Sequence, residues 1–303
     1  IQYLSGFKGT HGYVLLTERK SYLLTDPRYL EKAESVVPEG WSVVDVSEGL
    51  LNVLHTLLVK HRVKRLGLES AHVSMLLAKR LSTLTGIEII ETMDAVETQR
   101  IVKSAEELRL IRQSQKLNEQ LLKLALDGLK VGVSEAQMAW RIRLIAHDLG
   151  ASDVSFTPIV AFGAHTARPH HEPHAAKKLK RGDMVLFDIG FVYKEYASDL
   201  TRTFFTKSPT SEQVDVYQTV LTAQQAAILA AKPGAKADDV DRAARLFISD
   251  SGYKKKFGHA TGHGVGMDVH ELPRVAKTDQ TVLAAGMVLA IEPGIYLPGK
   301  LGV

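Results

Sequence analysis

The sequence predicts a mixed α+β protein in two parts, a small α/β domain over residues 1–100 and a larger α+β domain over residues 101–303. Two observations lead to this prediction. Short β-type runs alternate with helical stretches through the first part of the chain, which is the pattern of a small α/β domain. A capping pattern at Ser104 then begins a long amphipathic helix, and this helix opens the second domain.

The first domain is expected to hold five strands and two helices. β-branched and aromatic residues mark the strands, and longer runs with helical periodicity lie between them. The expected strands are Tyr13–Leu16, Tyr22–Thr25, Trp41–Val46, Arg65–Leu68 and Ile87–Ile90. The expected helices are Leu50–His61 and Ser74–Leu84. The first residues, Ile1–Leu4, are typical of a strand entered part-way, and we expect the natural chain to begin earlier and to continue after Val303.

In the second domain the helix signals are the clearest. Ser104 with Glu107 predicts a helix to about Lys130, and Ser134 predicts another that ends before Gly150. The other expected elements are a strand near Phe156–Phe162, a hairpin near Asp183–Phe205 with its turn at Tyr193–Glu195, helices near Ser211–Ala231 and Ala237–Asp250, and a last strand at Met287–Ile291.

Composition excludes several classes of function. The chain has 303 residues, of which 45% are hydrophobic and 24% charged, as in an ordinary globular protein. A net charge of +4, with no basic run longer than Lys254–Lys256, argues against a nucleic-acid partner. The absence of cysteine excludes disulfides and thiol nucleophiles and fits the reducing cytoplasm. No apolar run approaches the roughly 18 residues of a membrane span.

Three acidic residues interrupt apolar stretches that are expected to form buried strands: Asp188, Asp199 and Glu292. A buried carboxylate is costly without a positive partner. Asp188 and Asp199 fall on the two strands of the expected hairpin and can face each other across it. His263, in the glycine-rich segment Gly258–Gly266, is a fourth candidate, so the simplest partner is a metal ion or a pair of ions.

Each of these residues, taken alone, also has an ordinary structural explanation. The acids could be salt-bridged or strand-end residues, and His263 could be an ordinary loop histidine. The glycines around His263 also imitate part of a dinucleotide-binding fingerprint, but that motif needs a preceding strand, another spacing and a ribose-binding acid. His170 and His270 would bind or polarise substrate beside a metal, or else be solvated loop residues. His171 and His174 are expected to be loop or rim residues. The histidines expected to be scaffold are His11, His55, His61, His72 and His147.

Six motifs occur in a fixed order along the chain. They are Pro169-His170, Asp188-Ile-Gly190, Ser198-Asp-Leu-Thr-Arg202, Gly262-His-Gly-Val-Gly266, Val269-His-Glu271 and Ile291-Glu-Pro-Gly-Ile-Tyr296. This set resembles the pita-bread metallopeptidases, and among them the Xaa-Pro peptidases (prolidase and aminopeptidase P). The first hundred residues are similar to their creatinase-like N-terminal domain. The resemblance implies a pita-bread catalytic domain that hydrolyses the peptide bond before proline and releases the N-terminal residue.

The resemblance also implies a role for each matched residue. The metal ligands would be Asp188, Asp199, His263 and Glu292. Asp199 would bridge two ions, and Glu292 would also move protons. His170 and His270 would hold the substrate carbonyl and the tetrahedral intermediate. Arg202 would support the substrate side of the site, and Arg274 would receive a substrate carboxylate. A second glutamate, the fifth ligand, is expected at a position after Val303.

Two divalent ions that share a water molecule would lower its pKa and stabilise the developing oxyanion. Oxygen-rich ligands with one histidine and no cysteine favour Mn²⁺, Co²⁺ or Zn²⁺, and the resemblance favours Mn²⁺. It also implies a homodimer that acts on peptides with proline in the second position. Three alternatives remain: a methionine-aminopeptidase-like enzyme, a non-catalytic homologue that binds peptides or proteins, and a metal-free creatinase-like hydrolase. The sequence does not decide between dipeptidase and aminopeptidase.

Overall fold

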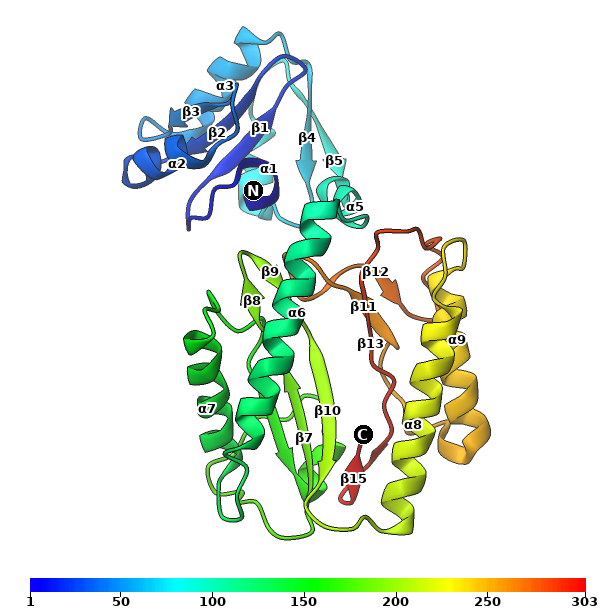
Figure 1. Ribbon diagram of the computed structural model, residues 1–303. Coiled ribbons are helices and arrows are strands. Elements are labelled where there is room, and N and C mark those ends of the chain that lie inside the picture. The colour runs from blue at the N-terminus through cyan, green and yellow to red at the C-terminus, as the bar shows by residue number, and fades with distance from the viewer. The chain divides into compact units, whose positions relative to one another are not determined.

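The computed structural model describes residues 1–303, and the chain divides into two compact units, Ile1–Ala95 and Val96–Val303 (Figure 1). Both units contain helices and strands, so the predicted mixture of the two is confirmed. One short helix, α5 (Ala95–Arg100), begins at the division between them.

The first unit is built on a three-stranded sheet and a separate strand pair. The strands are β1 (Tyr13–Leu16), β2 (Ser21–Thr25), β3 (Ser42–Asp45), β4 (Arg65–Glu69) and β5 (Glu88–Thr92). In the sheet, β2 is central, antiparallel to β1 and parallel to β3, while β4 pairs with β5 in parallel. All five strands were predicted, and the prediction is confirmed to within two residues at each end.

Four α-helices and a 3-10 turn accompany these strands. They are α1 (Gln2–Ser5), α2 (Leu30–Val36), α3 (Leu50–Lys60), α4 (Met75–Leu81) and η1 (Pro27–Tyr29). The expectation of a strand at Ile1–Leu4 is wrong, because α1 forms there and ends at Gly6, whose φ of 71° is left-handed. α2 was not predicted, since only Ala33 on it is buried and its apolar stripe is short.

The second unit contains two αβ layers. The first holds α6 (Ala105–Leu126), α7 (Glu135–Asp148), β6 (Ile159–Phe162), the 3-10 turn η2 (Gly163–Ala167), β7 (Met184–Ile189) and β10 (Leu200–Phe205). The second holds α8 (Ser211–Ala230), α9 (Ala237–Ile248), the π-turn η3 (Ser249–Tyr253), β11 (Gly262–Gly264), β12 (Glu271–Val275) and β13 (Leu289–Ile291). Two short pairs complete it: β8 (Val192–Tyr193) with β9 (Tyr196–Ala197), and β14 (Tyr296–Leu297) with β15 (Leu301–Gly302).

The central strands of the two layers carry Asp188 and His263. In the first layer the sheet order is β10–β7–β6, and in the second it is β12–β11–β13, all antiparallel. The helices α6 and α7 accompany the first sheet, and α8 and α9 lie beside the second (Figure 1). Each layer has its own core of buried hydrophobic residues.

Helix capping fixes where the first layer begins. The Ser104 side chain accepts the Glu107 N–H, and the Glu107 carboxylate accepts the Ser104 N–H. Ser134 forms the same reciprocal box with Gln137 at the start of α7. Both predicted helix starts are confirmed, whereas α6 ends at Leu126, earlier than predicted. None of the helices has both the length and the apolar composition needed to cross a membrane.

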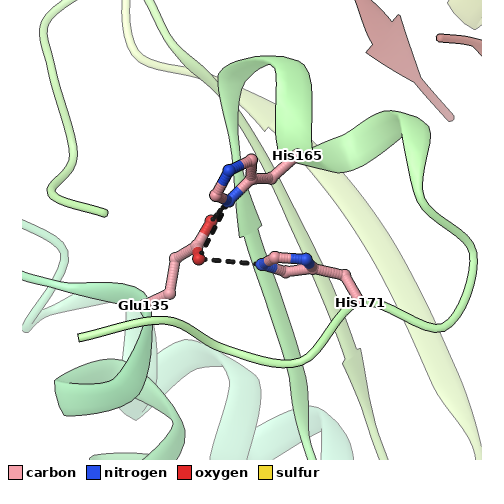
Figure 2. Close-up of side chains that lie close together, drawn as sticks. All are labelled: Glu135, His165 and His171. Carbon is pink, nitrogen blue, oxygen red and sulfur yellow. Dashed lines mark hydrogen bonds and ion pairs between the residues drawn. The ribbon is translucent and has the colours of Figure 1, made fainter. Parts of the chain in front are cut away.

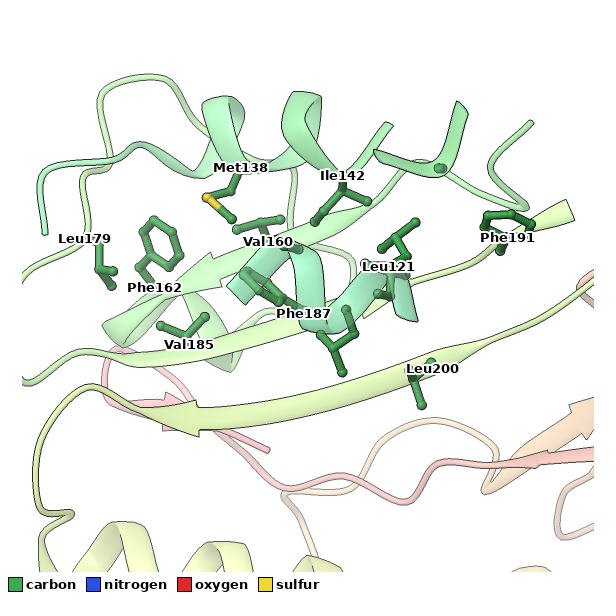
Figure 3. Packing of buried hydrophobic residues seen from close by; sticks show 14 residues of the cluster. Leu121, Met138, Ile142, Val160, Phe162, Leu179, Val185, Phe187, Phe191 and Leu200 are labelled. Carbon is green, nitrogen blue, oxygen red and sulfur yellow. The ribbon is translucent and has the colours of Figure 1, made fainter. Parts of the chain in front are cut away.

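Along β7, successive side chains point alternately to the core of the first layer and to the opposite face of the strand. Val185, Phe187 and Ile189 pack into the core of the first layer, and Met184 packs into the core of the second. Figure 3 shows Phe187 near Leu121 of α6 among the buried residues of the first layer. Because successive side chains of a strand point to opposite faces, Asp188 points away from the first core and toward the second layer.

Candidate metal centre

Asp188 lies near the end of the central strand β7. Its partner across the β7–β10 ladder is Thr201, whose hydroxyl donates to Asp188 Oδ1 at 3.0 Å. Asp199 precedes the first residue of β10, so Thr201, and not Asp199, is the residue directly opposite Asp188. Burial raises the pKa of Asp188 to about 7, and the charge of Asp199 contributes to the rise.

His263 and Glu292 come from the second layer. His263 is the middle residue of β11, and Glu292 directly follows β13. His263 Nε2 lies 3.5 Å from Asp199 Oδ2 and 3.4 Å from Glu292 Oε1. The side chains of His263 and Asp199 are 10% and 9% exposed, whereas that of Glu292 is 35% exposed. The three side chains thus form a cluster that reaches solvent at Glu292.

The glycines beside His263 let its strand lie close to both neighbours. A Cβ atom on Gly262 would lie 1.9 Å from the Ala290 carbonyl oxygen on β13. A Cβ on Gly264 would lie 2.2 Å from the Leu272 carbonyl oxygen on β12. Only glycine fits at either position, so the sequence around His263 is dictated by close strand packing as well as by chemistry.

The cluster contains more acidic than basic side chains, and their burial and mutual charges shift their pKa values. Burial raises the pKa of Glu292 to about 7, against the effect of His263 and with that of Asp199. Burial lowers the pKa of His263, but Asp199, the Gly264 carbonyl and Glu292 together raise it overall. The charges of Glu292 and His263 also act on Asp188, so all four candidate ligands share one electrostatic environment.

The residues fit a divalent metal ion. His263 Nε2 is buried without a hydrogen-bond partner, while its Nδ1 lies 3.0 Å from the Gly264 carbonyl oxygen. The distances from His263 Nε2 to the carboxylate oxygens of Asp199 and Glu292 are longer than those of a good hydrogen bond, but they suit ligand atoms that share a metal ion. A buried nitrogen with no partner, facing carboxylate oxygens, is the arrangement expected of a ligand set.

α9 holds the segment that leads to His263. The buried Asp241 accepts hydrogen bonds from the Thr261 hydroxyl at 2.8 Å and from two nitrogens of Arg245 at 2.6 and 2.8 Å. Arg245 also donates to the His259 carbonyl oxygen at 2.8 Å. Sequence reasoning missed this support. The available signal was the spacing of Asp241 and Arg245, which places them one turn apart on a predicted helix.

We expect Asp241→Asn to lower the free energy of unfolding by about 2 kcal/mol at neutral pH, since hydrogen bonds to a charged group are lost. Although burial raises it, the hydrogen bonds from Arg245 and Thr261 hold the pKa of Asp241 below its usual value. A lowered folded-state pKa stabilises the protein above the unfolded value of about 3.9, and this stabilisation is lost as the pH falls through the folded-state pKa. Urea unfolding at pH 7 and pH 3 measures this change in the free energy of unfolding.

The difference in free energy of unfolding between wild type and Asp241→Asn should therefore be smaller at pH 3 than at pH 7. Asp239→Asn is the matched control, because Asp239 also pairs with an arginine of α9 but on the exposed face. It should change the free energy of unfolding by less than about 1 kcal/mol at either pH. An equal gap at both pH values for Asp241→Asn would contradict the electrostatic explanation.

His170 and His270 both lie on exposed loop segments. The His270 ring packs edge-on against the His263 ring, with centroids 4.3 Å apart. Burial lowers the pKa of His270 and that of His259, and the charge of His170 lowers both further. Of the two predicted histidines, His270 thus lies directly against a candidate ligand. His259, whose Nε2 lies 2.9 Å from the Tyr296 hydroxyl, was missed, although it stands four residues before His263.

The loop that carries His270 is anchored by a buried ion-pair cluster. The Glu271 carboxylate accepts from Lys103 Nζ at 2.9 Å and from Arg100, which also binds Asp268 at 2.8 Å. The side chains of Lys103 and Glu271 are 1% and 6% exposed. Charges buried this deeply require such pairing. His270 thus lies between two residues, Asp268 and Glu271, that are held in place.

The two arginines are not part of the cluster. Arg202 is exposed, and its Nη1 donates to the Thr201 carbonyl oxygen at 2.8 Å. It shares the face of β10 with Leu200, opposite to that of the Thr201 hydroxyl. Arg274 is also exposed and borders a surface pocket of about 440 Å³. Its strand partner is His263, so both side chains project from the same face of the sheet.

Comparisons with known proteins agree with this geometry. Residues 109–303 match metallopeptidase family M24, and residues 1–102 match the creatinase/prolidase N-terminal domain. The chain is 34% identical over 306 residues to the Xaa-Pro dipeptidase of Pyrococcus horikoshii, covering 100% of this chain and 84% of the relative.

Solved structures give the same result. The Xaa-Pro dipeptidase from Bacillus anthracis superimposes with a TM-score of 0.95 at 31% identity, covering 100% of this chain and 84% of that one. The X-Pro aminopeptidase from Thermotoga maritima MSB8 superimposes with a TM-score of 0.90 at 34% identity, covering 100% and 86%. The predicted fold and enzyme class are confirmed. The chain belongs to metallopeptidase family M24, with a creatinase/prolidase N-terminal domain before its pita-bread catalytic domain.

Proposed function

We propose that this metallopeptidase hydrolyses the peptide bond before proline and releases the N-terminal residue. The observation that carries the proposal is the cluster in which the unpartnered Nε2 of His263 faces Asp199 and Glu292. With Asp188, these residues would hold two divalent ions. The donor set suits Mn²⁺, our first choice, and also Co²⁺ or Zn²⁺. The proline preference is supported by relatives named Xaa-Pro dipeptidase and X-Pro aminopeptidase.

Bound ions would lower the pKa of a water molecule and polarise the scissile carbonyl. The protein's own groups supply the rest of the chemistry. Glu292 is the cluster residue most open to solvent, which suits it to take a proton from the attacking water and pass it to the leaving nitrogen. His270 packs against His263, and His270 and His170 would donate hydrogen bonds to the carbonyl oxygen as negative charge develops on it.

The structure supports the proposed role in substrate binding for Arg274 but not for Arg202. Arg274 projects from the same face as His263 and is exposed, which supports its proposed role in receiving a substrate carboxylate. Arg202 lies on the face of β10 away from Asp188, so its proposed role rests on the resemblance alone. A cytoplasmic homodimer remains our prediction for the assembly, and light scattering in solution tests the dimer.

The test is to incubate the protein with Mn²⁺ and follow release of the first residue from three peptides. We expect cleavage of Xaa-Pro or Xaa-Pro-Xaa and none of a matched peptide with alanine in place of proline. Cleavage of the dipeptide alone would indicate prolidase, and cleavage of the longer peptide would indicate aminopeptidase P. Equal cleavage of the alanine peptide would favour the methionine-aminopeptidase-like alternative. Metal binding without any cleavage would favour a non-catalytic peptide-binding protein.

A further inference from the structure

A second cluster lies at the start of α7, around the carboxylate of Glu135 (Figure 2). The side chain of Glu135 is 0% exposed, and it accepts hydrogen bonds from four donors. These donors are the Phe162 N–H at 2.8 Å, His165 Nδ1 at 2.9 Å, His171 Nε2 at 2.8 Å and the His174 N–H at 3.1 Å. All four belong to one stretch of chain, residues 162–174, which also carries His170.

These bonds tie the loop to α7. A carboxylate removed from water needs hydrogen bonds on both oxygens, and Glu135 finds all of them in this single segment. Oε1 accepts from Phe162 and His165, and Oε2 accepts from His171 and His174. The loop cannot move away from α7 without leaving a buried charge unpartnered, so residues 162–174 have one strongly preferred position.

The position of His170 depends on this arrangement. His170 is exposed and makes no hydrogen bond of its own, whereas its neighbour His171 has a side chain that is only 4% exposed. The buried His171 therefore fixes the backbone from which His170 projects. The same loop lies against the strand pair that follows Glu292, because the Gly302 N–H donates to the Thr166 hydroxyl oxygen at 2.8 Å. Gly302 is the strand partner of Tyr296, whose hydroxyl lies 2.9 Å from His259 Nε2.

The Glu135 cluster differs from the metal centre in one respect. Its three side chains have the spacing of a ligand set, as do Asp199, His263 and Glu292. No oxygen of Glu135 and no imidazole nitrogen in this cluster is buried without a partner, whereas His263 Nε2 is. The Glu135 cluster is complete without a cation, which favours a hydrogen-bonded hub over a metal site.

We propose that Glu135 is a positioning residue, whose carboxylate holds the loop through His165 and His171 so that His170 is directed at the metal centre. The inference deepens the proposed function and rests on it for the role of His170. It assigns to His171, which was expected from the sequence to be a loop or rim residue, and to the partly buried His165 a role in positioning a third histidine. Glu135 itself would touch neither substrate nor metal.

The first experiment compares Glu135→Gln with wild type on the proline peptide that wild type cleaves. Glutamine keeps the volume but offers one acceptor oxygen, and its amide N–H₂ must face the N–H donors on the other side. We expect kcat to fall roughly 10- to 100-fold with KM within about twofold, as for a misplaced catalytic group. Glu172→Gln is the control, because Glu172 is exposed on the same loop, and it should match wild type.

A double-mutant cycle shows whether the effect passes through His170. In a His170→Ala background, Glu135→Gln should cost no more than about twofold further in kcat, because the group that it positions is already gone. If the full loss from Glu135→Gln persists in that background, Glu135 acts by another route and the proposal is overturned.

Conservative substitution of His171 separates a hydrogen bond from a metal ligand. The amide nitrogen of His171→Gln can donate to Glu135 in place of Nε2, so this variant should keep at least about half of the wild-type kcat. His171→Ala should behave like Glu135→Gln. Metal content should equal that of wild type in both variants. If His171→Gln lost one equivalent of metal along with its activity, the cluster would be a metal site and the proposal would be wrong.

Hydrogen exchange gives a readout that does not need activity. Amides of residues 163–174 should exchange at least about tenfold faster in Glu135→Gln than in Glu172→Gln, while the rest of α7 is unchanged. If wild type cleaved no proline peptide, the proposed function would fail, and the exchange data would still decide whether Glu135 holds the loop. Unchanged exchange in residues 163–174 would refute the inference whatever the peptide results.

Discussion

Asp199→Asn is expected to lower kcat for a proline peptide by at least about 1,000-fold and to abolish tight metal binding. Asp199 is 3.5 Å from His263, and its charge raises the pKa of both Asp188 and Glu292, so it lies among the other donors. Asparagine preserves the shape of the side chain but removes the negative charge that would balance two cations. Steady-state kinetics and metal analysis of the purified variant measure both effects.

The matched control is Asp250→Asn, the same change at an exposed residue beyond α9. It should leave kcat and metal content unaltered. Chelation of wild type should reach the activity level of Asp199→Asn, and added Mn²⁺ should restore wild type but not the variant. If Asp199→Asn kept its full metal content and a kcat within tenfold of wild type, the assignment of this cluster as the metal centre would be wrong.

Local signals explain what the sequence could predict. The starts of α6 and α7 depend on side chains three residues apart, Ser104 with Glu107 and Ser134 with Gln137. The interactions that fix each helix start are therefore contained in a short stretch of sequence. The turn of the hairpin was placed correctly for the same reason. Lys194 and Glu195 adopt positive φ angles of 46° and 70°, as a tight turn between β8 and β9 requires.

Long-range geometry explains what the sequence could not predict. The register that places Thr201, and not Asp199, opposite Asp188 depends on how β8 and β9 extend the hairpin. The Glu135 hub joins side chains 30 and 36 residues apart, and nothing local marks Glu135 as buried, since an acid in the first turn of a helix is ordinary. The three acidic candidate ligands were singled out because acids in apolar runs are costly, and His263 because of its glycine-rich segment; neither reason depends on register.

The strand β7 shows how stability and chemistry are divided. Its odd-numbered residues from Val185 to Ile189 belong to the core of the first layer, and Asp188 lies on the opposite face. α6 supports the end of this strand, where the Asn118 side chain donates to the Ile189 carbonyl oxygen at 3.0 Å. A change on the core face should therefore affect folding, and a change on the other face should affect catalysis.

Phe187→Ala is accordingly expected to lower the free energy of unfolding of the Val96–Val303 unit by about 3–5 kcal/mol, the cost of a large cavity in a core. Phe187 is 0% exposed on the central strand, and its ring packs edge-on against Phe204 at 6.1 Å. Urea unfolding followed by circular dichroism measures the loss. Phe247→Ala on α9, where the phenylalanine is 37% exposed, is the control and should cost less than about 1 kcal/mol.

The two faces of β7 make a stronger form of this prediction. At a temperature where Phe187→Ala is still folded, its kcat should stay within about threefold of wild type, because the cavity lies on the face away from Asp188. Asp199→Asn should show the reverse, with activity lost and the free energy of unfolding changed by less than about 1 kcal/mol in metal-free protein. If Phe187→Ala lost activity while fully folded, the core and the metal centre would be coupled through the strand itself. In that case, the separation of the two faces would not hold.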